Sequence, residues 1–280
     1  MSDPRLLLVQ GDVAAASLEG TVAAARFVPT RRHTVAAPAA PLRREPRLEA
    51  EQMSQLLFGE AFDVLVEEAG FAFGQAGRDG YVGWVDLDLL IAGAGQPTHR
   101  VKALRTYAFT EPSIKVLPDG LYSLNCLVEV EAREGRFVKA RHGGWFVADH
   151  LAPLGEVEAD PVDVALRFLG APYLWGGNES LGLDCSGLVQ QALRACGIAC
   201  PRDSDQQMTL GEALEAAEPL QRGDLVFWRG HVGFVSGEDT LLHANGHHMA
   251  VVAESLEGAI RRIEAAGSGL PTGRRRMALA

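Results

Sequence analysis

One cysteine in this chain has the surroundings of a nucleophile. Cys185 lies in the segment LDCSGLVQQAL, directly before a run with the apolar spacing of a helix. The first N–H groups of a helix and the positive end of its dipole favour a thiolate, which is the reactive form of cysteine. A buried structural thiol would gain nothing from that position. The sequence therefore indicates Cys185 as a candidate catalytic residue.

Thiol catalysis also needs a base that takes the proton and a third group that orients the base. His231 opens the run HVGFVSG and His243 closes the run TLLHA, and the short loop GED joins these two strand-like segments. If the strands pair antiparallel, both imidazoles project from one face, about two positions out of register and within reach of a hydrogen bond. His247 and His248 follow beyond a turn and are expected to be exposed.

The region around these residues predicts an α+β unit over residues 157–276. Asp160 and Pro161 form a good N-cap and first-turn pair for a short helix. The helix from Cys185 follows, and from residue 223 onward four short runs with glycine turns predict strands. A helix followed by an antiparallel sheet is an α+β arrangement.

The N-terminal part predicts an arm and two small β-domains. Residues 1–46, rich in Ala, Pro and Arg, predict an extended arm packed on the surface. Residues 47–95 and 96–153 each contain a short strand, a glycine turn and then Gly-Trp. In both, Asp follows this glycine after five residues and Leu after seven. The matched pairs are Gly83/Gly144, Trp84/Trp145, Asp88/Asp149 and Leu90/Leu151. Short alternating strands with glycine turns in a repeat predict two small barrels in tandem.

Composition and charge exclude several classes of protein. The net charge of −10 argues against a nucleic-acid partner, which would need a basic face. The four cysteines show neither a CxxC pair nor a disulfide spacing, and they suggest no metal site. No run approaches the roughly 20 apolar residues of a membrane span. The first residues lack the apolar core of a secretory signal, so we expect a cytoplasmic protein with reduced thiols and no membrane partner.

Four blocks of the sequence carry a family resemblance. LDCSGLVQQAL, PRDSDQQ, GDLVFWRGHVGFVSG and LLHANG occur in this order, and together they strongly resemble the NlpC-type cysteine peptidases of bacterial cell-wall metabolism. The segments DGYVGWV and HGGWFV resemble bacterial SH3-like domains. The resemblance implies a papain-like catalytic domain behind two SH3-like barrels, with no cofactor. It also implies that Cys185 is the nucleophile, His231 the general base and acid, and His243 the orienting residue.

The same resemblance implies a set of substrate-binding residues. They are Glu60, Tyr81, Tyr173, Trp175, Asp184, Ser186, Asp203 and Ser204. Asp184 and Ser186 flank the nucleophile, whose backbone N–H would help to stabilise an oxyanion. Glu60 and Tyr81 belong to the first SH3-like domain, which in the muropeptide subgroup lends residues to the site. A carboxylate and a phenol there would suit the free amine of a peptide.

These expectations combine into one function and three alternatives. We expect an endopeptidase that cleaves γ-D-glutamyl–diamino acid bonds in small peptides released during peptidoglycan turnover. An amidase or acyltransferase could use the same Cys–His pair on another acyl group. The SH3-like pair could instead be a binding module beside an inactive catalytic domain, or the three catalytic candidates could bind zinc, although their spacing matches no common site. The diamino acid and the oligomeric state stay open.

Overall fold

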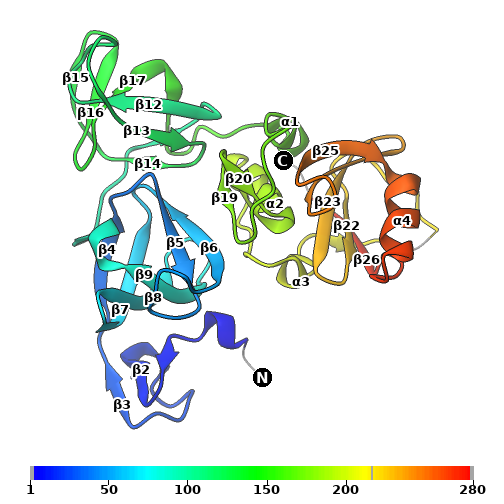
Figure 1. Cartoon of the computed structure of the whole chain (residues 1–280), viewed down its shortest axis with the longest axis horizontal. Coiled ribbons are helices and arrows are strands. Elements are labelled where there is room, and N and C mark those ends of the chain that lie inside the picture. The colour runs from blue at the N-terminus through cyan, green and yellow to red at the C-terminus, as the bar shows by residue number, and fades with distance from the viewer. Residues whose placement is uncertain (1–2, 216, 278–280) are drawn as a thin grey trace. The chain divides into compact units, whose positions relative to one another are not determined.

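The structure is a computed structural model that describes residues 3–215 and 217–277. The chain divides into two compact units, Met1–Leu154 and Gly155–Ala280, which are described separately (Figure 1). In the part of the chain that is described, no helix is long and apolar enough to cross a membrane.

The first unit begins with a small three-stranded sheet. Its strands are β1 (Val9–Gln10), β2 (Val13–Ala15) and β3 (Arg26–Val28), with short 3-10 turns at Pro4–Leu6 and Ala16–Leu18. Apolar side chains of this segment pack against Phe73 and Trp84 of the following sheet. This segment up to β3 thus lies on the surface of that sheet, but it is folded into strands and turns and is not simply extended.

A seven-stranded antiparallel sheet follows, in the order β10-β4-β7-β8-β9-β5-β6. Its strands are β4 (Arg31–Val35), β5 (Ala39–Arg43), β6 (Gln52–Leu57), β7 (Ala61–Glu68), β8 (Phe71–Ala76), β9 (Val82–Asp86) and β10 (Leu90–Ala92). The expectation of an arm up to residue 46 is wrong for β4 and β5, which are integral strands. Alternate residues of β5, Ala40 and Leu42, are fully buried in the core of this sheet, which is why the segment pairs instead of lying free.

The rest of the first unit consists of a five-stranded sheet, β13-β12-β17-β16-β15, and a three-stranded sheet, β14-β11-β18. The strands are β11 (His99–Val101), β12 (Arg105–Phe109), β13 (Pro118–Ser123), β14 (Leu127–Val128), β15 (Val130–Glu134), β16 (Phe137–Ala140), β17 (Trp145–Val147) and β18 (Leu151–Pro153). Both repeated Gly-Trp segments have the same local structure, a strand, a 3-10 turn and a second strand. The turns are Leu87–Leu89 and Ala148–His150. The sheets of this unit are consistent with two small barrels.

The second unit contains helices and a six-stranded antiparallel sheet in the order β21-β26-β22-β23-β24-β25. The sheet strands are β21 (Glu212–Ala213), β22 (Leu225–Trp228), β23 (His231–Gly237), β24 (Thr240–Asn245), β25 (Ala250–Ser255) and β26 (Gly273–Arg276). The helices are α1 (Pro161–Leu166), α2 (Cys185–Ala195), α3 (Ser204–Gln207) and α4 (Leu256–Ala265), and the short strands β19 (Asn178–Glu179) and β20 (Gly182–Leu183) form a hairpin before α2. A helix followed by an antiparallel sheet is the arrangement that the sequence predicted.

Two helices cover opposite faces of this sheet (Figure 1). Helix α2 contacts β23 and β24 and buries an apolar stripe that includes Leu188 and Leu193. Helix α4 packs Ala259 and Ile263 against a cluster on the other face, which includes Val235. Burial of apolar surface on both faces holds β23 and β24 rigidly between the helices.

Candidate active site

Cys185 is the first residue of α2. The side chain of Asp184 caps the helix by accepting a hydrogen bond from the Gly187 N–H at 2.7 Å. The thiol is buried, its Sγ lies 4.0 Å from the Gly230 carbonyl oxygen, and the Val232 N–H donates to it. These two main-chain groups flank His231, so the thiol lies beside the start of β23.

The two predicted histidines meet in the structure. His231 Nε2 lies 2.8 Å from His243 Nδ1, and the rings are edge to face with centroids 5.0 Å apart. Strands β23 and β24 pair with Phe234 opposite Leu242, so His243 lies opposite Gly233, two positions from His231. A Cβ at Gly233 would lie 3.0 Å from the His243 Cβ, so the glycine makes room for the imidazole. The structure thus has the antiparallel pairing and the offset that the sequence analysis described.

Burial keeps the Cys185 thiol and the two imidazoles uncharged in the resting site. It raises the pKa of the Cys185 thiol to about 12, helped by the Asp184 carboxylate and opposed by backbone N–H groups and Arg202. Burial also lowers the pKa of His231 to about 3 and that of His243 to about 4. At neutral pH the free site therefore holds a thiol and neutral imidazoles. The helix start alone favours a thiolate, but desolvation outweighs it here.

His243 has further polar neighbours that the sequence analysis missed. Its side chain is fully buried, and its Nε2 lies 2.8 Å from Glu254 Oε1 on β25 and 3.0 Å from Asn245 Nδ2. Arg262 of α4 forms an ion pair with the same Glu254 oxygen. Asn245 lies two residues after His243 on β24, within the block LLHANG. Only the pairing of β24 with β25 and the packing of α4 bring Glu254 and Arg262 to His243, so no local motif signals these two. His247 and His248 are exposed, as expected.

Asp184 and Ser186 belong to a buried ion-pair network. Arg202, which has no exposed surface, donates to both carboxylate oxygens of Asp184 at 2.5 and 3.0 Å and to Ser186 Oγ at 2.8 Å. Asp184 also accepts from the Gly176 N–H at 3.0 Å. The two residues therefore hold the loop before α2 and the first turn of the helix in place. Their predicted contact with a substrate stays a prediction.

Arg202→Met is expected to destabilise the second unit by about 3–5 kcal/mol, because it leaves the Asp184 carboxylate buried without its cation. Chemical denaturation followed by tryptophan fluorescence measures the change. Arg261→Met is the matched control, because its pair with Glu257 is exposed and should contribute less than about 0.5 kcal/mol. Equal stability of the two variants would contradict a structural role for Arg202.

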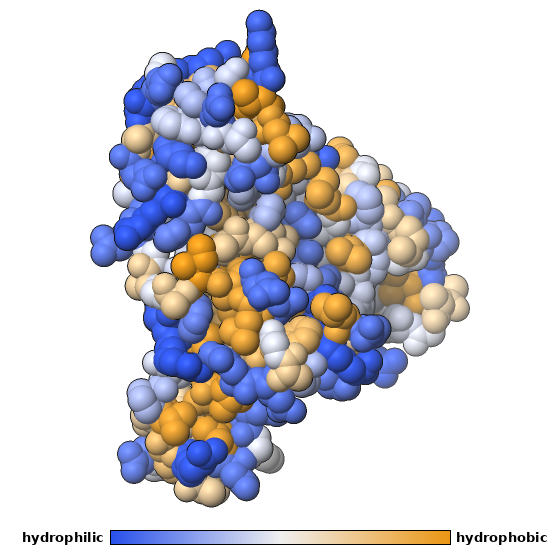
Figure 2. Space-filling view, turned by 60° about the vertical axis from the view of Figure 1, so that its left-hand side comes forward, coloured by the Kyte–Doolittle hydropathy of each residue, from blue (hydrophilic) through white to orange (hydrophobic). Residues whose placement is uncertain are grey.

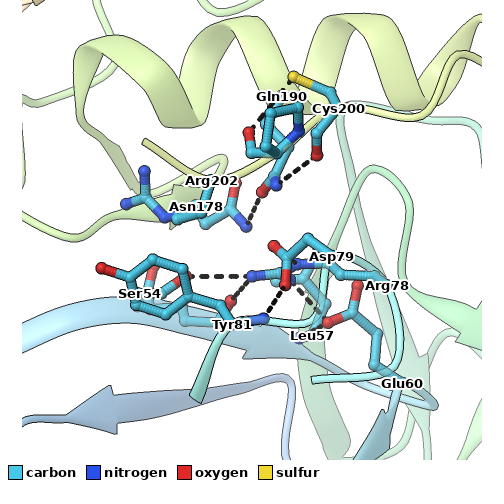
Figure 3. A network of polar contacts seen from close by, with 12 residues as sticks. Ser54, Leu57, Glu60, Arg78, Asp79, Tyr81, Asn178, Gln190, Cys200 and Arg202 are labelled. Atoms are coloured by element: carbon cyan, nitrogen blue, oxygen red, sulfur yellow. Dashed lines mark hydrogen bonds and ion pairs between the residues drawn. The ribbon is translucent and has the colours of Figure 1, made fainter. Parts of the chain in front are cut away.

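The amides behind α2 form a second buried network. Asn178 Nδ2 donates to Gln190 Oε1 at 3.0 Å, and Gln190 Nε2 donates to the Cys200 carbonyl oxygen at 2.9 Å (Figure 3). Gln191 Nε2 completes the set by donating to Asn178 Oδ1 at 3.0 Å. Buried polar groups are stable only when their hydrogen bonds are made, so this network fixes the hairpin β19–β20 against α2.

The other predicted residues of the second unit lie near the start of α2 and α3. Tyr173 is half-buried, and burial is the main cause that raises the pKa of its phenol, with a smaller contribution from the neighbouring Cys185 and Asp184. Trp175 is 61% exposed. Ser204 is buried at the start of α3, and the preceding Asp203 donates its N–H to Gln206 Oε1 at 3.2 Å. Substrate contacts by these four residues stay predictions.

Large apolar side chains remain exposed in both units. Figure 2 shows apolar patches between hydrophilic regions on one face of the molecule. In the second unit, the exposed apolar residues include Leu174 and Trp175, which precede the hairpin β19–β20, and Leu181 in its turn.

Glu60 and Tyr81 lie in the first unit, where a buried charge network includes Glu60. Glu60 Oε2 accepts from the Leu57 N–H at 3.0 Å and pairs with Arg78 Nη1 at 2.6 Å (Figure 3). Arg78 also pairs with Asp79 at 3.0 Å, and Asp79 accepts from the Tyr81 N–H at 3.1 Å. Recognition of a substrate amine by Glu60 and Tyr81 stays a prediction.

Comparison with known proteins places the chain in a family. Residues 170–264 match the NlpC/P60 family, and residues 42–90 match the bacterial dipeptidyl-peptidase Sh3 domain. The chain is 30% identical over 212 residues to the gamma-D-glutamyl-L-lysine dipeptidyl-peptidase of Bacillus subtilis (strain 168), covering 68% of this chain and 71% of that protein. The chain belongs to the NlpC/P60 family. The resemblance seen in the four sequence blocks is thereby confirmed.

Other curated relatives match over shorter stretches. A Bacillus cereus gamma-D-glutamyl-L-lysine dipeptidyl-peptidase is 37% identical over 93 residues, and dipeptidyl-peptidase 6 of Lysinibacillus sphaericus is 33% identical over 113 residues. These matches cover 30% and 40% of this chain. The chain spans less than half the length of these two relatives, with 28% and 41% of them covered.

Solved structures of the NlpC/P60 family share the fold. A family protein from Bacillus cereus superimposes with a TM-score of 0.74 at 19% identity, covering 89% of this chain and all of that one. An NlpC/P60 endopeptidase from Photobacterium damselae subsp. piscicida gives a TM-score of 0.58 at 14% identity, covering 88% of this chain and 71% of that one. The predicted α+β, papain-like fold class is confirmed.

Proposed function

We propose that this chain is a cysteine peptidase that hydrolyses peptides derived from peptidoglycan, at the bond between the γ-carboxyl group of D-glutamate and a diamino acid. The observation that carries the proposal is the His231–His243 hydrogen bond of 2.8 Å beside a thiol at the start of a helix. A nucleophile, a base and a group that orients the base are the components of covalent acyl transfer.

The reaction follows from the positions of these groups. The Cys185 thiol gives its proton to His231 as sulfur attacks the γ-carbonyl carbon, since both groups are neutral in the resting site. The N–H of Cys185 has no partner within α2, because it belongs to the first turn, and it is placed to stabilise the oxyanion. The C–N bond then breaks, and the leaving amine takes the proton from His231.

The second half-reaction regenerates the thiol. The glutamyl group remains on Cys185 as a thioester, and His231 takes a proton from the attacking water. Collapse of the second tetrahedral intermediate breaks the C–S bond, and the sulfur recovers the proton through His231. His243 orients the His231 ring through both steps.

The names of the relatives support the substrate class. Two of them are named gamma-D-glutamyl-L-lysine dipeptidyl-peptidase, and one of these is aligned over 68% of this chain. A dipeptidyl-peptidase releases two residues from a free amino end, so the proposed substrate begins with L-Ala-γ-D-Glu and carries a free amine. Recycling of such released peptides in the cytoplasm is part of the same proposal.

The test uses the tripeptide L-Ala-γ-D-Glu with either diaminopimelate or lysine at the third position. We expect mass spectrometry to identify L-Ala-D-Glu and the free diamino acid as the products. An N-acetylated tripeptide should be cleaved at least tenfold more slowly, as expected for an enzyme that recognises the amine. If neither tripeptide is cleaved while another amide or an acyl ester is, the amidase or acyltransferase alternative replaces the proposal.

A further inference from the structure

His243 has a polar contact on each nitrogen of its ring. Its Nδ1 lies 2.8 Å from His231 Nε2, and its Nε2 lies 2.8 Å from Glu254 Oε1. The His243 side chain has no exposed surface, so water does not compete for either nitrogen. The imidazole therefore connects the proposed general base to a carboxylate outside the three proposed catalytic residues.

Glu254 is held as an anion. It lies on β25 opposite Leu241, and Arg262 of α4 forms an ion pair with its Oε1. Burial raises the pKa of Glu254, but the hydrogen bonds and charges of His243 and Arg262 outweigh burial and lower the pKa overall. His248, with Nδ1 3.9 Å from the same oxygen, is the other titratable group next to it.

An anionic carboxylate determines where the imidazole protons lie. Because the Glu254 carboxylate only accepts hydrogen bonds, Nε2 of His243 must carry its proton. Neutral His243 then has a lone pair at Nδ1, which accepts the Nε2–H of His231. Neutral His231 in turn has its lone pair at Nδ1. That nitrogen is the one left to take the proton of the Cys185 thiol.

Asn245 favours the opposite arrangement. Its Nδ2 lies 3.0 Å from His243 Nε2 and is a donor, because Asn245 Oδ1 accepts the His248 N–H at 2.8 Å. If the Asn245 amide donated to Nε2, the proton of His243 would move to Nδ1, and His231 would have to accept at Nε2. His231 would then carry its proton at Nδ1 and could not act as a base toward the thiol. The charge of Glu254 decides between the two arrangements, since charge-assisted hydrogen bonds are the stronger ones.

We infer that Glu254, held by Arg262, is a positioning residue that sets the tautomer of His243 and, through it, the nitrogen at which His231 accepts a proton. The inference rests on the proposed function, because it assigns a role within that reaction. The tests distinguish a failure of this inference from a failure of the proposed function.

The first test compares Glu254→Gln with Glu257→Gln, a control whose carboxylate is exposed and, among the described residues, forms an ion pair only with Arg261 on the same helix. A wrong tautomer slows the chemical step and not binding. We expect Glu254→Gln to lower kcat by about 10-fold to 100-fold with KM changed less than about twofold. A kcat within about threefold of the control would overturn the inference.

The second test moves the carboxylate instead of removing it. Asn245→Asp, combined with Glu254→Gln, places an acceptor 3.0 Å from His243 Nε2, at the position of the present donor. We expect the double variant to recover at least fivefold in kcat over Glu254→Gln. A purely structural role for Glu254 predicts no recovery, because Arg262 stays without its carboxylate, and that result would overturn the inference.

The third test needs no substrate. Iodoacetamide labelling at pH 7, mapped by mass spectrometry, measures Cys185 against the more exposed Cys196 as an internal reference. We expect the Cys185-to-Cys196 rate ratio to fall at least threefold in Glu254→Gln, and an unchanged ratio would overturn the inference. If wild-type protein cleaves no peptide, the proposed function fails, but this ratio still decides the role of Glu254. If Glu254→Gln does not fold, Arg262→Gln replaces it with the same expected direction.

Discussion

Cys185→Ala is expected to lower kcat/KM for the tripeptide by at least about 1,000-fold, because no other group can form the acyl-enzyme at that position. Cys185 is buried at the first turn of α2, where alanine is well tolerated and the Asp184 cap is kept. The fold should therefore survive, and the thermal unfolding midpoint should stay within a few degrees of that of the wild type. Initial rates of product formation measure kcat/KM, and a thermal scan measures the unfolding midpoint.

Cys196→Ala provides the control for this loss. Cys196 follows the last residue of α2, at the opposite end of the helix from Cys185, and is partly exposed. We expect its kcat/KM to stay within about twofold of the wild-type value. Cleavage that survives Cys185→Ala but is lost in Cys196→Ala would contradict the assignment of Cys185 and identify Cys196 as the nucleophile.

His231→Ala is expected to cost nearly as much as loss of the thiol, because both proton transfers pass through this imidazole. A loss of about 1,000-fold in kcat, with KM little changed, is the expected result. His243→Ala should cost less, since an orienting group acts through geometry and tautomer. His247→Ala is the matched control, because its exposed ring makes contact only with His248 among the described contacts, and its activity should be near that of the wild type.

The pH dependence provides a second measurement on His231. A base acts in its neutral form, which is present above its pKa, and burial lowers the pKa of His231 to about 3 from an ordinary 6.5. The acid limb of kcat/KM should therefore lie well below pH 6.5, with most activity retained at pH 5. An acid limb with its midpoint at or above pH 6.5 would show that the free enzyme uses a solvated or ion-paired histidine instead.

The sequence predicted those parts of the site that local pattern controls. The start of the helix at Cys185 follows from the apolar period of the segment LDCSGLVQQAL, and the offset of His231 and His243 follows from strand alternation across a short loop. Each of these rests on neighbours along the chain, and each is present in the structure.

The parts that the sequence analysis missed depend on contacts between distant segments. Glu254 reaches His243 only because β25 pairs with β24, and Arg262 reaches Glu254 only because α4 folds back over that strand. Strand β5 has an Ala- and Pro-containing sequence that resembles a linker, but its neighbours β6 and β9 complete its pairing. The charge state of Cys185 depends on the burial of its side chain, which no local motif reports.

The central claim is that Cys185 forms a thioester with the γ-carboxyl group of D-glutamate. Acid quenching of the protein during turnover of L-Ala-γ-D-Glu-diaminopimelate, followed by peptide mapping by mass spectrometry, tests it directly. The account predicts an L-Ala-γ-D-Glu adduct on the peptide that contains Cys185, and none in the His231→Ala variant quenched at the same time. An adduct on Cys126, Cys196 or Cys200, or steady cleavage of the substrate with no adduct on any cysteine, would contradict it.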